Sequence, residues 1–587
     1  MKKRLISAAL AALLACAPCA LAEPEDSMTA ATVPVYYAGL YGEEQAELTV
    51  YYKDGDTQIP YLDADTAAAV MTKLYQDGYG DYSKDAAYEL RAVTAGQTVT
   101  FVRENGYTMA VDFAADTINF RDYDIFVAHS FDETAVELSH SVNFDEEGRP
   151  AYLQRVTEAD FSRYGDELTI DLKQYGIDLI EENGVGYIPA QTIADLLLGE
   201  TYTLFLYNGE ACFFLNYENY TADLQDPESG YSALFYGAER QPRGQALIDF
   251  TYNELCMILD QVYGFKDSRG ITSFDDYFEE VAYEGTDLKT LLRSEDPLDM
   301  DKALSVLTRL AFDDMHSGYQ AVSCYTGYEN NAEARGISGG ASHRQYYEAY
   351  MTYVTARAEA FPDGVPGYQE VGDTAYVTFD TFVAPRNKDY YSEPPTDDTA
   401  ADVYGLLIYA NSQIKREDSP IKNVVIDLSC NRGGMEDAAA FVCGWFLGEA
   451  DVYLQDSLTG ASAVNVYRCD ANLDREFDEN DTVSDLNLYC LISPVSFSCG
   501  NLVPCMFRAS GRVVLVGQTT GGGSCVVHPL TTASGSFLQC SGYKHISSMK
   551  NGSFYDADQG ISPDVVLTKP ASFYDREALT EYLDGLK

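Results

Sequence analysis

The 587-residue chain is poor in positive charge. Lys and Arg total 39 against 92 Asp and Glu, which gives a formal net charge of −53. Because nucleic acid and anionic membranes would repel such a chain, we expect neither as a partner. With 46% hydrophobic residues and only 20 prolines, the composition also excludes a disordered or collagen-like chain. The length allows about three or four domains.

The chain also lacks the spacings of a structural metal site. None of its six histidines forms an H-x3-H pair, and no two cysteines beyond residue 22 form a C-x2-C pair. We therefore expect no metal and no cofactor. Of the 13 cysteines, the eleven beyond residue 22 are an odd number. At least one of them should have no intrachain disulfide partner.

Long apolar runs are absent beyond the N-terminus, so we expect no later segment to span a membrane. Residues 1–22 combine a basic start, an apolar run and Ala20-Leu21-Ala22 before the acidic Glu23, the pattern of a secretory signal peptide. An alternative is a lipidation box at Leu13-Leu14-Ala15-Cys16, which would anchor the protein through Cys16. Either way, we predict a secreted or extracytoplasmic surface protein.

Residues 23–240 have the pattern of an α+β region with a weak internal repeat. An Ile-Pro step precedes a helix-like run twice, at Ile59-Pro60 and at Ile188-Pro189. Each run is followed by strand-like segments around a turn signal, Asn105-Gly106 and Asn208-Gly209. Two related modules would explain the repeat, and so would the ordinary recurrence of hairpins and helices.

The remaining chain divides into a helical part and an α/β part. Residues 241–366 show amphipathic periodicity, including a helix predicted over residues 300–312 behind Asp299 as N-cap, with His316 just after its end. Residues 367–587 alternate strands with helices, which is typical of an α/β domain.

Two turns in this α/β part carry the chemical signals. A buried strand over residues 424–428 leads to Gly433-Gly434, and glycines there free backbone N–H groups to stabilise an oxyanion. A second strand leads to Ser498, which is predicted to open a helix; a serine there is well placed for nucleophilic attack, with the Cys499 N–H as a second donor. Taken alone, each motif is more often an ordinary turn or N-cap.

In order and spacing, four motifs resemble the tail-specific, or carboxy-terminal processing, serine peptidases with their tricorn-like and retinoid-binding-protein-like relatives. These motifs are Ile426–Gly434, Ser496–Gly500, Gly511–Gly517 with Thr519–Gly522, and Gln559–Asp564. The resemblance implies an α/β fold with a crotonase-like ββα core. It also implies a serine-type endopeptidase that cleaves a peptide or protein substrate through an acyl-enzyme. In that mechanism Ser498 is the nucleophile, and Gly433 or Gly434 forms the oxyanion hole with Cys499.

The catalytic base and acid follow from a departure within this resemblance. Gly523 stands where relatives with a Ser-Lys dyad have the lysine, so the chain is more similar to the tricorn-like branch, whose base is an upstream histidine. His316 matches that position, with His545 or Lys544 as alternatives. The branch also has an acid before the Gly-Ile-x-Pro-Asp motif, for which Asp558 ranks ahead of Asp556.

Two further expectations follow from differences between this chain and the relatives with a Ser-Lys dyad. Residues 318–367 are too few for the PDZ module that dyad relatives insert there, so we do not expect capture of substrate C-termini by strand addition. The missing lysine and the inexact acid also leave an alternative function open. In it, the peptidase fold is catalytically inactive and binds peptides or hydrophobic ligands.

Overall fold

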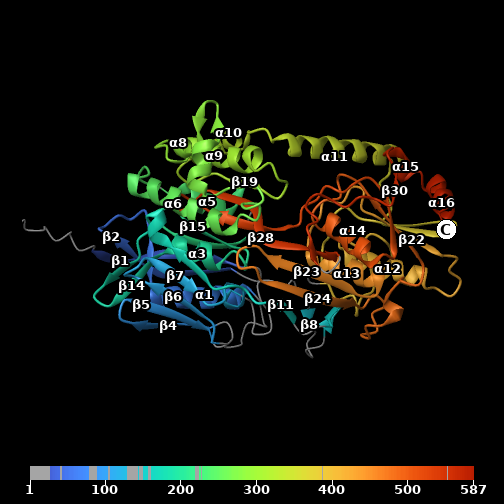
Figure 1. Ribbon diagram of the computed structural model, residues 1–587, viewed down its shortest axis with the longest axis horizontal. Coiled ribbons are helices and arrows are strands. Elements are labelled where there is room, and N and C mark those ends of the chain that lie inside the picture. The colour runs from blue at the N-terminus through green and yellow to red at the C-terminus, as the bar shows by residue number, and fades with distance from the viewer. Residues whose placement is uncertain are drawn as a thin grey trace, which may run out of the picture.

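The computed structural model of the protein describes residues 27–39, 43–78, 89–103, 106–127, 143–144, 150–156, 160–217, 224–226, 228–238, 240–385, 388–550 and 553–586. The predicted signal peptide, with Cys16, lies outside these residues. Figure 1 shows two lobes, connected by the long strand β28 (Phe537–Lys550) and, across the top, by helix α11 (Ala341–Ala360). Within the described ranges, no helix is long and apolar enough to cross a membrane.

One lobe is built on a seven-stranded sheet that contains both Ile-Pro steps. Its order is β13-β14-β3-β2-β1-β16-β15. Strand β3 pairs with β14 so that Leu62 lies opposite Ile188, and helices α1 and α3 follow these two strands directly. The two β-α units therefore share one sheet. The bounds are β1 (Met28–Ala38), β2 (Glu43–Lys53), β3 (Tyr61–Asp63), α1 (Ala64–Gly78), β13 (Ile180–Glu182), β14 (Val185–Pro189), α3 (Ala190–Leu197), β15 (Thr203–Tyr207) and β16 (Cys212–Asn216).

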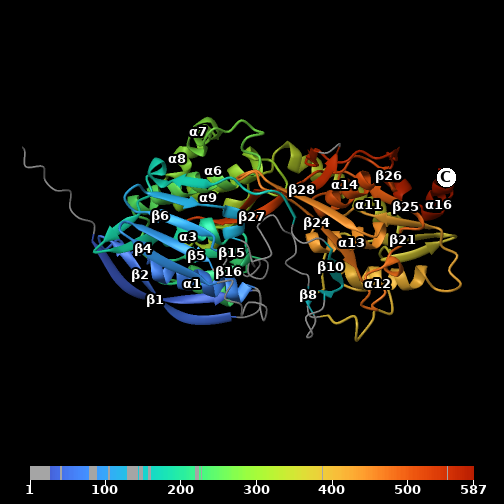
Figure 2. The same ribbon diagram turned by 60° about the horizontal axis from the view of Figure 1, so that its bottom comes forward.

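Both predicted hairpins are confirmed. Strands β5 and β6 pair antiparallel on either side of Gly106, although Asn105 itself lies outside the described residues, and β15 pairs antiparallel with β16 around Asn208-Gly209. The first hairpin belongs to a five-stranded sheet, and Figure 2 shows it beside α1 and α3. This sheet comprises β4 (Leu90–Ala95), β5 (Thr98–Arg103), β6 (Thr108–Asp112), β7 (Thr117–Phe120) and β12 (Leu168–Asp171), with the short helix α2 (Tyr123–Phe126) nearby in sequence.

The helical part covers this lobe. The helix predicted over residues 300–312 is displaced, because α9 (Pro297–Val306) begins after Asp296, whose side chain accepts from the Leu298 N–H, and not after Asp299. The chain then makes one π-helical turn over Leu307–Ala311. The other helices are α5 (Gly230–Gly237), α6 (Gln245–Val262), α7 (Phe274–Glu280), α8 (Leu288–Leu292) and α10 (Asn331–Arg335), with a small hairpin of β17 (Ala282–Tyr283) and β18 (Thr286–Asp287).

An eight-stranded sheet joins the lobes and includes strands from all three predicted segments. Strand β28 pairs with β19 of the helical part, with β27 and with β23 of the α/β part. Strands β10 and β11 of the N-terminal segment pair with β24. The bounds are β10 (Leu153–Arg155), β11 (Asp160–Arg163), β19 (Gly318–Ala321), β23 (Ala450–Asp456), β24 (Ser462–Cys469), β27 (Cys525–Thr531) and β29 (Ser553–Tyr555); β8 (Asn143–Phe144) and β9 (Pro150–Ala151) form a separate pair.

The second lobe contains the predicted α/β domain. Strands β21, β22, β25, β26 and β30 run parallel in one sheet, with β20 antiparallel at its edge. The bounds are β20 (Tyr368–Val371), β21 (Thr374–Thr378), α12 (Val403–Ile414), β22 (Asn423–Asp427), α13 (Glu436–Leu447), β25 (Asn487–Ile492), α14 (Cys499–Ser510), β26 (Val513–Gly517), β30 (Val565–Val566), α15 (Ala571–Tyr574) and α16 (Arg576–Asp584). Parallel neighbours end at the same sheet edge, so the turns after β22 and β25 meet there.

Candidate active site

The two predicted turns are joined by hydrogen bonds. The Leu428 N–H donates to the Leu491 carbonyl at 3.0 Å, and the Phe497 N–H donates to the Asn431 carbonyl at 3.2 Å. The Ser496 hydroxyl donates to the Leu428 carbonyl at 2.7 Å. These bonds place the glycine-rich turn directly beside Ser498.

Ser498 has a strained backbone and a free hydroxyl. It precedes α14 with φ 57° and ψ −124°, a conformation that is rare for a residue with a side chain. Its N–H donates to the Gly522 carbonyl at 3.0 Å, while its side chain makes no capping bond to the helix. The ordinary N-cap explanation therefore does not account for this serine, which stays partly exposed.

The glycine turn has backbone amides beside Ser498, of which one is already occupied. The Gly433 N–H donates to the Asn431 Oδ1 at 2.9 Å, so it is not free to bind an oxyanion. A Cβ on Gly433 would lie 2.5 Å from the Ser498 Cβ, so only glycine fits there. The Phe382 N–H donates to the Gly433 carbonyl at 2.9 Å. This bond fixes the orientation of the peptide group between Gly433 and Gly434. The Gly434 N–H therefore points away from Phe382.

Cys499 has a backbone amide at the start of α14 and a buried thiol. As the first residue of α14, its N–H has no partner within the helix. Its thiol is buried and donates to the Gly434 carbonyl at 3.1 Å. Burial raises the pKa of the Cys499 thiol far above its ordinary value, so the thiol stays protonated and is a poor nucleophile.

His316 lies against the residue that precedes the serine. Its ring packs on Phe497 with 4.7 Å between ring centroids, and its side chain is buried. A Cβ on Gly523 would lie 3.2 Å from the His316 Cε1 and 2.6 Å from the Phe497 ring. The Phe497 ring and, less closely, the imidazole therefore fill the space that a side chain at position 523 would enter. The structure shows no hydrogen bond between His316 and Ser498, both of which are described residues.

Burial gives the imidazole a low proton affinity. It lowers the pKa of His316 to about 4, while the negative charge of Asp314 opposes the shift. The ring is therefore neutral at neutral pH and able to accept a proton.

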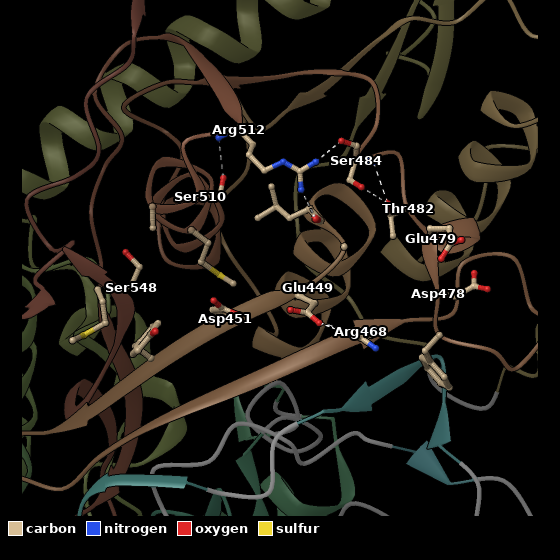
Figure 3. A pocket seen from close by; sticks show the side chains of 17 residues that line it. Glu449, Asp451, Arg468, Asp478, Glu479, Thr482, Ser484, Ser510, Arg512 and Ser548 are labelled. Atoms are coloured by element: carbon tan, nitrogen blue, oxygen red, sulfur yellow. Dashed lines mark hydrogen bonds and ion pairs between the residues drawn. The ribbon is translucent and has the colours of Figure 1, made fainter. Parts of the chain in front are cut away.

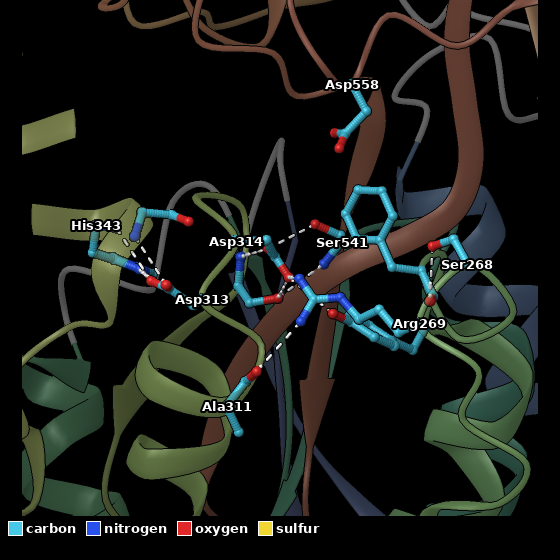
Figure 4. A network of polar contacts seen from close by, with 12 residues as sticks. Ser268, Arg269, Ala311, Asp313, Asp314, His343, Ser541 and Asp558 are labelled. Atoms are coloured by element: carbon cyan, nitrogen blue, oxygen red, sulfur yellow. Dashed lines mark hydrogen bonds and ion pairs between the residues drawn. The ribbon is translucent and has the colours of Figure 1, made fainter. Parts of the chain in front are cut away.

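The sequence reasoning missed the role of Asp314, which anchors the His316 loop. Its carboxylate accepts from the Ser317 N–H at 2.7 Å, the Ser317 hydroxyl at 2.9 Å, the Ser541 hydroxyl at 2.8 Å and the Tyr263 hydroxyl at 3.1 Å. Figure 4 shows this network with Asp313 and His343 beside it. The spacing of Asp314 and Ser317 is that of a local side-chain turn and was the available signal.

The candidate acids lie on the loop after β29. Asp558 accepts from the Ser524 N–H at 3.4 Å, and burial together with Asp556 raises the pKa of Asp558 to about 6. In Figure 4 its carboxylate is turned toward the Asp314 network. Asp556 accepts from the Ser524 hydroxyl at 3.3 Å and from the Asp558 N–H at 2.9 Å. Neither carboxylate is hydrogen-bonded to His316 in the described part of the chain.

Both alternative bases are engaged elsewhere. Lys544 forms a buried ion pair with Glu200, so its ammonium is not free. The ring of His545 contacts the Cys525 thiol at 3.6 Å, and burial lowers the pKa of His545. His316 is thus the better-placed candidate of the three.

A cavity of about 660 Å³ lies elsewhere on the α/β lobe (Figure 3). It is lined by residues of β23, α14 and the loop before β25, and none of the predicted site residues lines it. Its arginines are already bonded, Arg468 to Glu449 and Arg512 to the Leu447 carbonyl at 2.8 Å. Across the described ranges, no group of His, Cys, Asp and Glu is arranged to hold a metal ion. The eleven cysteines in these ranges are all buried, and none of them forms a disulfide.

A serine on a strained strand-to-helix turn, above the ends of a parallel sheet, resembles the position of the nucleophile in α/β hydrolases, although the chain lacks the first glycine of their G-x-S-x-G motif. Residues 373–567 match the model of peptidase family S41, so the chain contains a domain of this peptidase family. That segment includes Ser498, Gly433 and Asp558, while His316 lies upstream of it. The predicted α/β fold and family are thereby confirmed.

Comparisons with other proteins add little beyond this. No curated protein sequence matches the chain. Among solved structures, the photosystem II D1 C-terminal processing protease is 19% identical with a TM-score of 0.27, and the match covers 35% of this chain but only 46% of that one. A lipoprotein from Streptococcus agalactiae is 14% identical, with coverages of 59% and 99% and a TM-score of 0.34. The tricorn protease is 10% identical, with coverages of 85% and 46% and a TM-score of 0.31.

Proposed function

We propose that the protein is a serine endopeptidase in which Ser498 is the nucleophile and His316 is the base. The observation that carries this proposal is the imidazole packed against Phe497, in the space that a side chain at position 523 would need. The free hydroxyl and strained backbone of Ser498 support the same conclusion, since strain that local packing does not require is often retained for chemistry.

The proposed reaction is acyl transfer to and from the serine. His316 accepts the proton of the Ser498 hydroxyl as the oxygen attacks a peptide carbonyl, and the Gly434 and Cys499 amides stabilise the oxyanion. The imidazolium then donates its proton to the leaving amine, and water hydrolyses the acyl-enzyme. Asp558 stabilises the imidazolium. Substrate binding brings the two side chains into hydrogen-bond contact, as apo sites often require.

Labelling with a fluorophosphonate tests the mechanism, because only an activated serine reacts. We expect the wild type to be labelled and to hydrolyse quenched fluorescent peptides, and Ser498→Ala to do neither. His316→Gln should label at least about 100-fold more slowly, since a general base contributes typically that much. Ser510→Ala, at the exposed far end of the same helix, is the matched control and should react like the wild type.

A second function competes with this one. The absence of a hydrogen bond between the described Ser498 and His316 side chains favours a protein that binds peptides or hydrophobic ligands without cleaving them. Equal labelling of the wild type and Ser498→Ala, with no peptide turnover, would support that alternative and contradict the enzyme.

We also propose that the protein is exported through its N-terminal segment. The basic, apolar and small-residue pattern of residues 1–22 supports this. Fractionation of expressing cells, with the mass of the mature protein, distinguishes cleavage after Ala22 from lipid attachment at Cys16. Full-length protein retained in the cytoplasm would contradict both.

A further inference from the structure

An arginine without a counter-charge lies beside the proposed oxyanion hole. Arg432 directly precedes Gly433, on the turn that touches Ser498, and its side chain is exposed. Within the described residues, its guanidinium has no ion-pair or hydrogen-bond partner. This is unusual on a chain with 92 acidic and 39 basic residues, because a carboxylate is generally at hand to pair with an arginine.

An acidic residue that contacts the Arg432 backbone is already paired with another arginine. The Arg432 backbone N–H donates to the Asp380 carbonyl at 3.0 Å, whereas the Asp380 carboxylate accepts from the Arg357 guanidinium. That pair is bidentate, with N–O distances of 2.6 and 2.5 Å. A bidentate pair satisfies the carboxylate in its preferred geometry, so the second guanidinium remains unmatched.

Aromatic side chains of α11 hold Arg432 in place. Its guanidinium lies 5.3 Å from the centroid of the Tyr350 ring, a cation–π contact that fixes its position without using its hydrogen-bond donors. One turn earlier on α11, Tyr346 packs edge-on against Phe497 with 5.8 Å between centroids, and its hydroxyl donates to the Val495 carbonyl at 3.2 Å. Arg432, α11 and Phe497 therefore form one wall beside Ser498.

We propose that Arg432 binds a carboxylate of the substrate close to the bond that is cleaved. The proposal rests on the peptidase function above and adds a substrate preference to it. A guanidinium presents a planar set of donors that matches a carboxylate, and a positioned cation loses less freedom on binding than a mobile one. An arginine side chain spans about two residues of an extended peptide. The carboxylate therefore belongs within about two residues of the scissile bond.

Paired peptides test the preference and its source. One pair differs only in Glu against Gln near the scissile bond and has an amidated C-terminus, and a second pair has neutral side chains with a free or an amidated C-terminus. We expect kcat/KM to be about 10- to 100-fold higher for the carboxylate member of at least one pair. A difference in the first pair indicates a side-chain carboxylate, and a difference in the second indicates the C-terminal carboxylate. In Arg432→Gln this ratio should fall to within about twofold of one, and Arg432→Glu should favour a Lys-containing peptide. The expected size is that of a charge-assisted hydrogen bond.

The matched control is Arg344→Gln, which removes the same charge from an exposed residue of α11 whose guanidinium donates to the Gly339 carbonyl at 2.7 Å. It should leave the ratio unchanged. An Arg432→Gln enzyme that keeps the wild-type ratio while its turnover still depends on Ser498 would overturn this inference and leave the peptidase proposal intact. If no peptide is hydrolysed, the binding affinities of the same pairs for Ser498→Ala, with and without Arg432→Gln, decide the preference independently of catalysis.

Discussion

Ser498 combines an unfavourable backbone with an unused hydroxyl. Residues at positive φ with a side chain cost of order 1–3 kcal/mol and persist where neighbouring bonds hold them in place. Here the Gly522 carbonyl holds the Ser498 N–H, and the absence of a Cβ at Gly433 leaves room for the serine side chain. The geometry therefore directs the hydroxyl away from the helix terminus that an ordinary N-cap would satisfy.

The pH dependence of activity follows from two perturbed groups. With a pKa of about 4, His316 is neutral above that pH, and with a pKa of about 6, Asp558 is ionised only above pH 6. If both forms are needed, kcat/KM should rise with pH and reach half its plateau near pH 6. Peptide hydrolysis between pH 4 and 8, with circular dichroism to verify folding, measures this.

Asp558→Asn separates the two groups. The variant should be slower at pH 7, because the imidazolium loses a stabilising charge, and its remaining activity should extend to lower pH, toward the pKa of His316. An unchanged midpoint near pH 6 would show that Asp558 does not control the acid side of the profile.

At the scale of elements, the loop after the π-helical turn positions His316, the proposed base. The four polar groups that donate to the Asp314 carboxylate come from three separate segments. The carboxylate therefore connects Tyr263, just after α6, with the His316 loop and β28. A π-helical turn shifts the register of the following residues and is often found at functional sites.

Asp314→Ala should therefore weaken both stability and catalysis. We expect a loss of about 1–3 kcal/mol in the free energy of unfolding, because buried donors lose their acceptor. We also expect kcat to fall by at least about tenfold as His316 becomes less well positioned. Denaturant unfolding and peptide turnover measure the two effects. Asp313→Ala is the control: its carboxylate binds Ser342 and His343 at the start of α11, so a similar loss of kcat would contradict a specific role for Asp314.

The end of β22 is held by a buried ion pair. Asp427 lies 2.6 Å from the Arg576 guanidinium of α16, and the two residues are 2% and 5% exposed. This pair indicates a structural role for Asp427. Arg576→Ala should cost about 3–5 kcal/mol of unfolding free energy, because it leaves a buried charge unpaired.

Arg508→Ala provides the comparison, since Arg508 and Asp564 form a pair whose side chains are 40% and 37% exposed. That substitution should cost about 0–1 kcal/mol. Chemical denaturation of both variants measures the difference, and equal losses would contradict a special contribution from the buried pair.

At the scale of the whole molecule, local patterns were predicted well and long-range assembly was not. The hairpins, the parallel strand at β22 and the helix opened by Cys499 follow from turn residues and hydrophobic periodicity. The eight-stranded sheet that joins the lobes could not be predicted, because the pairing of β10 with β24 and of β19 with β28 brings together segments that are far apart in sequence. The occupied Gly433 amide likewise depends on the Asn431 side-chain orientation, which spacing does not reveal.

The lobes also share a buried interface. Lys544 and the Tyr543 hydroxyl of β28 both bind Glu200, which follows α3. The Gln191 amide of α3 donates to the Thr531 carbonyl at 3.2 Å, and Leu538 and Tyr543 belong to the core of the N-terminal lobe.

A protein that starts at residue 241 should therefore not fold into a stable peptidase. Removing residues 1–240 would expose apolar residues of β28 and leave the buried Lys544 without its partner Glu200. We expect aggregation or loss of cooperative unfolding, which size-exclusion chromatography and thermal melting would detect. A monomeric truncated protein with the full-length melting temperature would show that the lobes are independent.

Strand β28 has one more consequence. Asp314, which anchors the loop of His316, lies beside the core of one lobe, and Cys499, which follows Ser498, lies in the core of the other. The same 14-residue strand contacts both sides, through Ser541 near Asp314 and Ser547 near Cys505. The spacing between the His316 ring and the Ser498 hydroxyl therefore depends on how both lobes hold this strand. We expect a small molecule that shifted one lobe relative to the other to abolish the proposed peptidase activity without binding at Ser498.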